Sequence, residues 1–149
     1  MSPAPSVAFA SAAEVETLIA DFERASVSRE RWTHHAHIAV AVWNLLHYEA
    51  AEALVVVRDG ILRLNEANGV PRTPTGGYHE TLTRFYMWAV GEALAEIDRT
   101  ARLDEVCNAV IARCGDRKLP LRYYTQPVLM SWTARTSWVE PDVRALDSL

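Results

Sequence analysis

The sequence has few cysteines, little excess charge and no long apolar run, and each absence excludes a class of protein. Its two cysteines, Cys107 and Cys114, are too few for a disulfide scaffold, which favours a reducing, cytoplasmic location. The net charge of −4 disfavours a nucleic-acid partner. No apolar run approaches the ~20 residues of a membrane-spanning helix, and the first residues lack the pattern of a secretory signal. Lys118 is the sole lysine beside fourteen arginines, a bias that favours a bacterial origin.

The common catalytic and nucleotide-binding motifs are also absent. The chain contains no G-x-S-x-G, no glycine-rich phosphate loop and no dinucleotide-binding fingerprint. It also lacks a segment in which polar and apolar residues alternate, as they do in a half-buried strand. What remains is a chain of 149 residues, 50% hydrophobic and 23% charged, which is the composition of one soluble globular domain.

Apolar residues recur at helical spacing along most of the chain, which predicts an all-α, single-domain bundle of about five helices. Ser11 is a candidate N-cap for the first helix, which should end near Ser26. A second helix, apolar on most sides, starts after Thr33 and runs to about Tyr48 at the centre of the bundle. The other three helices are expected over residues 49–68, 78–98 and 102–114. The last of them carries both cysteines on its apolar face, which predicts buried, unreactive thiols.

The two ends of the chain are expected to differ in order. Residues 1–10 are expected to be flexible. Residues 116–149 are partly irregular, with one short helix after Ser131, yet they carry four large aromatic side chains: Tyr123, Tyr124, Trp132 and Trp138. Because so many aromatic side chains favour burial, we expect a C-terminal extension that wraps the bundle.

Histidines are concentrated where two of the expected helices begin. His34 and His37 are three residues apart and share the inward face of the second helix, whereas His35 points about 100° away from His34. His79 follows the Gly76-Gly77 turn and lies on the inward stripe of the fourth helix. Two facing helices that each begin with inward histidines can bring three imidazoles together, as in the metal sites of helical bundles.

The sequence therefore predicts a divalent transition metal held by His34, His37 and His79. Neutral imidazole suits Zn, Fe, Cu and Ni, and three protein ligands leave an open position for water or substrate. Glu80 follows His79 directly and is the candidate for proton transfer or for orienting a ligand. The candidates for a pocket wall, for which plain packing or a surface ion pair is the alternative, are Tyr78, Arg84, Tyr86, Tyr123 and Tyr124.

Three classes of function fit these residues. The first is a small metal-dependent enzyme that acts on a small molecule, with hydrolytic, lyase, isomerase and oxidative reactions all open. The second is a metal-free helical module that binds a small molecule or regulates another protein, in which the histidines form hydrogen bonds within the core. The third is a dimeric interaction protein, for which five tryptophans supply enough aromatic surface.

Four short segments carry a resemblance to a known group of proteins. They are residues 32–37, with the pattern W-x-H-x-x-H, and residues 77–84, 122–124 and 138–142. The chain resembles a family of small bacterial all-helical proteins in which W-x-H-x-x-H, Y-H-E-T and R-Y-Y recur in this order, over about residues 30–142. The resemblance implies no particular reaction, substrate or metal, and its site positions are His34, His37, His79 and Glu80.

Overall fold

The computed structural model describes residues 7–149, and within that range it contains seven α-helices and one 3₁₀ turn but no strand. The predicted all-α bundle is confirmed. None of the helices in this range is long and apolar enough to cross a membrane. The five principal helices are α1 (Ala12–Glu23), α2 (His34–His47), α3 (Ala50–Ala67), α4 (Glu80–Leu94) and α5 (Leu103–Cys114).

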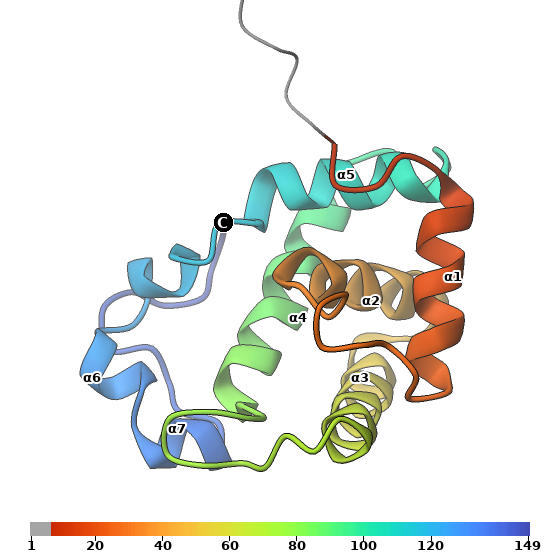
Figure 1. Ribbon diagram of the computed structural model, residues 1–149. Helices are drawn as coiled ribbons and strands as arrows, with labels where there is room; N and C mark the ends of the chain where they lie inside the picture. Colours follow the sequence, from red (N-terminus) through yellow and green to blue (C-terminus); the bar gives the residue numbers. More distant parts are fainter. Residues whose placement is uncertain (1–6) are drawn as a thin grey trace, which may run out of the picture.

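Helix α2 is the centre of the bundle and contacts α1, α3, α4 and α5 (Figure 1). Its N-cap is Thr33, whose hydroxyl accepts a hydrogen bond from the Ala36 amide at 3.1 Å, as the sequence predicts. The middle of the helix, from Ile38 to Val42, is buried on all sides. A helix that is apolar all round has no face for solvent, so its central position follows directly from its composition.

The ends of two helices differ from the expectation. Helix α1 stops at Glu23, before Ser26, because Ala25 adopts a left-handed conformation with φ 53 and closes the helix. Helix α4 begins at Glu80, and His79 is its N-cap instead of part of its first turn. Its other end tightens into a turn after Leu94, so it does not reach residue 98.

The C-terminal extension contains one 3₁₀ turn and two short helices, where the sequence predicts a single helix. These elements are η1 (Leu119–Arg122), α6 (Gln126–Leu129) and α7 (Trp132–Thr136), and they cover one side of α4 (Figure 1). Tyr123 and Tyr124 are each only 1% exposed and pack on Phe85 of α4. The Tyr123 hydroxyl donates to the Ser148 carbonyl at 2.8 Å, and the Tyr124 hydroxyl donates to the Val139 carbonyl at 2.7 Å. These two bonds hold the earlier and later parts of the extension together.

The N-terminal segment and the cysteines complete the core. Residues 1–6 lie outside the described residues, but Phe9 is buried, and its backbone N–H and carbonyl both bond to the Asn108 amide side chain. The segment expected to be flexible is therefore tied to α5 at Phe9. Cys107 and Cys114 are buried and unpaired, as predicted, and burial raises their pKa values to about 12 and about 11.

Candidate functional site

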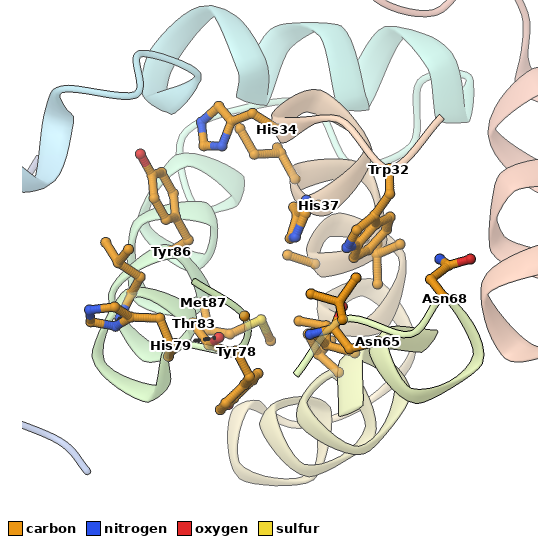
Figure 2. A pocket seen from close by; sticks show the side chains of 18 of the residues that line it. Trp32, His34, His37, Asn65, Asn68, Tyr78, His79, Thr83, Tyr86 and Met87 are labelled. Carbon is orange, nitrogen blue, oxygen red and sulfur yellow. Dashed lines mark hydrogen bonds between the residues drawn. The ribbon is translucent and has the colours of Figure 1, made fainter. Parts of the chain in front are cut away.

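A cavity of about 560 Å³ lies between α2, α3 and α4, and it is large enough for a small organic molecule. Its walls are mainly aliphatic and aromatic. Figure 2 shows His34 and His37 entering from α2, with Tyr86 from α4 across the open space. The apolar residues of its wall include Trp32, Ile38, Val40, Ala41, Val57, Ile61, Tyr78, Leu82, Tyr86 and Met87.

His37 presents a free hydrogen-bond acceptor to this cavity. Its Nδ1 lies 2.8 Å from the Thr33 carbonyl, which can only accept, so Nδ1 carries the proton and Nε2 keeps its lone pair. No hydrogen-bond partner for Nε2 occurs among residues 7–149. Desolvation lowers the pKa of His37 to about 4, with small contributions from His34 and Arg117, so the ring is neutral at pH 7.

The His37 ring is also held in place by an aromatic stack. Its centroid lies 3.9 Å from Trp32, and Trp32 stacks in turn on Phe22 of α1 at 5.4 Å. The tip of the Phe22 ring is close to Gly60 of α3, where a Cβ would lie only 2.3 Å from the Phe22 Cζ. This glycine lets α1 and α3 approach, and the stack fixes the orientation of the imidazole.

His34 lies one helical turn before His37 and is also half-buried. Its Nε2 is buried without a hydrogen-bond partner in the described part of the chain, and its ring meets Tyr86 edge-on at 4.9 Å. Burial, assisted by the nearby charge of Arg117, lowers its pKa. A buried ring nitrogen without a partner is rare in proteins.

His79 has a structural role that the sequence does not reveal. Its Nδ1 accepts the Leu82 amide at 3.1 Å as the N-cap of α4, and its Nε2 donates to the Leu129 carbonyl of the extension at 2.8 Å. Both ring nitrogens therefore have protein partners. Coordination of a metal by His79 would require one of these bonds to break. No group of three or more His, Cys, Asp or Glu side chains within residues 7–149 is arranged to hold a metal ion.

Glu80 belongs to an ion-paired network outside the cavity wall. Its two carboxylate oxygens accept from Arg58 Nε and Nη2 at 2.9 and 2.6 Å, and the Tyr78 hydroxyl donates to it at 2.6 Å. Burial raises the pKa of Glu80, but these hydrogen bonds outweigh burial and leave the pKa below its ordinary value. The ion pair between Arg58 and Glu80 therefore links α3 to α4. A role of Glu80 in proton transfer stays a prediction.

The other predicted wall residues divide into two groups. Tyr78 and Tyr86 line the cavity, and the Tyr86 hydroxyl donates to the Asp116 carbonyl at 3.1 Å. Arg84, Tyr123 and Tyr124 do not reach it. Arg84 lies over the Trp138 ring at 4.9 Å, and both tyrosines belong to the core beneath the extension.

Sequence reasoning missed several wall residues. Met87 stands in an apolar stretch where nothing distinguishes a cavity wall from ordinary core. Trp32 follows a polar stretch, and only its place in the W-x-H-x-x-H pattern marks it. Arg117 belongs to the irregular segment after α5, and neither motif nor periodicity marks it.

Comparison of the chain with protein-family models, with curated proteins and with solved structures gives no match.

Proposed function

We propose that this protein binds a small organic molecule in the cavity between α2, α3 and α4, and that His37 recognises a hydrogen-bond donor of that molecule. The observation that carries the proposal is the unpartnered Nε2 of His37 at the wall of a mainly apolar cavity. Sites for small molecules combine apolar walls with a few fixed polar groups that orient the ligand. The bond from Nδ1 to Thr33 and the stack on Trp32 supply that fixed orientation.

The electrostatics of His37 favour recognition over acid–base catalysis. A general base works best when its pKa lies near the working pH. Burial holds the pKa of His37 at about 4, so at pH 7 the ring is a good hydrogen-bond acceptor but a weak proton acceptor. A ligand hydroxyl or N–H that bonds to Nε2 would also satisfy an acceptor that the protein itself leaves free.

The test compares two probes that differ by one donor, 4-phenylbutan-1-ol and its methyl ether. We expect calorimetry to show the alcohol binding about fivefold more tightly than the ether, because a neutral hydrogen bond contributes about 1 kcal/mol. His37→Leu should remove this difference. His47→Leu is the matched control, since His47 has the same Nδ1–carbonyl bond and tryptophan stack but lies exposed at the other end of α2.

A second variant locates the binding site. Ala41 is buried on the α2 wall of the cavity, so Ala41→Phe should fill the space and abolish binding of both probes. Thermal unfolding of each variant confirms that it is folded. If neither probe binds the wild-type protein at millimolar concentration, or if Ala41→Phe binds both unchanged, the proposal is wrong.

A divalent transition metal is the second candidate ligand, which would make the protein a small metal-dependent enzyme. The specific observation in its favour is the hydrogen bond from Nδ1 of His37 to a backbone carbonyl, the arrangement that orients most metal-binding histidines. His34 would join as the second ligand if the Tyr86 ring moved aside. The remaining ligands would come from water or substrate.

Elemental analysis of the purified protein tests the metal directly. If this candidate holds, we expect about one equivalent of metal that is lost in His37→Gln and kept in His79→Asn, because asparagine can cap α4 in place of the imidazole. Loss of metal in both variants would instead support the three-histidine site that the sequence predicts. A metal-free protein that takes up no Zn²⁺ at neutral pH would rule out both arrangements.

A further inference from the structure

The charged residues around the cavity are all of one sign. Twenty residues line it, and they include two arginines, Arg29 and Arg117, but no aspartate or glutamate. Both arginines are exposed, and within residues 7–149 neither has a carboxylate within ion-pair distance. The other lining side chains with polar atoms are neutral at pH 7. The cavity therefore combines an apolar interior with a cationic rim.

Arg117 is the arginine that lies at the histidine end of the cavity. It follows Gly115 and Asp116, where the chain leaves α5, and the Tyr86 hydroxyl reaches the Asp116 carbonyl at this point. Arg117 lines the same cavity as His34 and His37, and Tyr86, which bonds to the residue before it, packs on the His34 ring at 4.9 Å. Arg29 also lines the cavity but belongs to the loop before Trp32.

Asp116 precedes Arg117 in the chain, but in the described structure the two form no ion pair. Its Oδ1 accepts the Lys118 amide at 2.9 Å within the same turn, and its side chain is not part of the cavity wall. A guanidinium without a protein carboxylate beside an apolar cavity is suited to a ligand that is apolar along its body and anionic at one end.

We propose that the natural ligand is an amphipathic carboxylate whose apolar part fills the cavity between Ile38, Ile61 and Met87 and whose carboxylate meets Arg117 at the rim. A separate hydroxyl or N–H of the same molecule donates to His37, because an ionised carboxylate has no proton to donate. This inference rests on the proposed small-molecule site and adds the chemical class of its ligand. The mainly aliphatic and aromatic walls favour a ligand with an apolar body over one that is polar on all sides. The guanidinium of Arg117 matches the planar, singly charged carboxylate.

The experiment compares 4-phenylbutyrate with the methyl ether of 4-phenylbutan-1-ol, because neither probe can donate a hydrogen bond to His37 and only the first is charged. At pH 7.5 and low salt we expect the carboxylate to bind about fivefold more tightly than the ether. Raising the NaCl concentration should reduce this preference, because an exposed ion pair is screened. Arg117→Gln should remove most of the preference and leave the affinity for the ether unchanged.

Arg29→Gln is the matched control, since it removes the same charge from the other rim arginine and should preserve the preference. If the ether binds and the carboxylate binds no more tightly, the anionic class is wrong while the small-molecule site stands. If Arg29→Gln abolishes the preference and Arg117→Gln does not, the assignment of the carboxylate to Arg117 is wrong. If neither probe binds, the proposed site itself fails.

Discussion

Replacing Gly77 with alanine is expected to lower the free energy of unfolding by about 3 kcal/mol. Gly77 has φ 82, a conformation that side chains strain, and a Cβ there would lie 2.4 Å from the Pro71 carbonyl oxygen and 2.8 Å from the Arg72 Cα. Both contacts are to backbone, so no side-chain rotation can relieve them. Chemical denaturation monitored by circular dichroism measures the change.

Two other glycines between α3 and α4, Gly76 and Gly69, are the controls for this expectation. Gly76→Ala should cost less than about 1 kcal/mol, because its Cβ would meet only the Thr73 hydroxyl at 3.5 Å and φ is not positive. Gly69 also has a positive φ of 67, but a Cβ there would lie in open space. Gly69→Ala should therefore lower the free energy of unfolding by about 1 kcal/mol. Equal losses at Gly76 and Gly77 would contradict the argument that the close approach of residues 71 and 72 requires a glycine.

Acidification is expected to destabilise the fold through His37 by about 2–3 kcal/mol. Desolvation lowers the pKa of His37 to about 4 in the folded protein, against an ordinary value of 6.5. Below pH 6.5 the unfolded chain therefore binds a proton that the folded chain does not. This contribution to stability is complete above about pH 6.5, falls as the pH falls and is fully lost by about pH 4.

The measurement is the free energy of unfolding from urea titrations at several pH values between 4 and 7.5. His37→Gln should give a shallower slope than the wild-type protein across this range, whatever its absolute stability. His47→Gln should keep the wild-type slope, because the His47 ring is exposed in the folded protein. Parallel curves for wild type and His37→Gln would show that the ring is not desolvated as the structure indicates.

The parts of the fold that the sequence predicts are those with a local signal. Ser11 and Thr33 cap their helices as expected. The apolar residues that recur at helical spacing along α1 are all buried: Val15, Leu18, Ile19 and Phe22. Gly69 closes α3 with two backbone bonds, from its own amide and from Val70. The end of α1 was not predicted correctly, because the left-handed position that ends this helix is taken by Ala25. Glycine is the residue that usually marks such a position in a sequence.

The candidate site was only partly predictable, because its chemistry depends on contacts between distant residues. The shared face of His34 and His37 follows from their spacing, and both reach the cavity. The roles of His79 and Glu80 depend on Leu129, fifty residues later, and on Arg58 in another helix. His79 lines the cavity and also caps its own helix, and residue spacing does not reveal that both of its ring nitrogens already have partners.

The bonds between the start of α4 and the C-terminal extension have a consequence for the order in which the protein is made. His79 donates to the Leu129 carbonyl, and the Gly77 carbonyl accepts from Arg135. The Thr81 hydroxyl donates to the Ser137 carbonyl and accepts from the Val139 amide. A ribosome releases these partners after α1 to α5 have already emerged. Nascent chains can thus assemble the five-helix bundle early, while the α4 side of the cavity is completed only when residues 129–139 have left the exit tunnel.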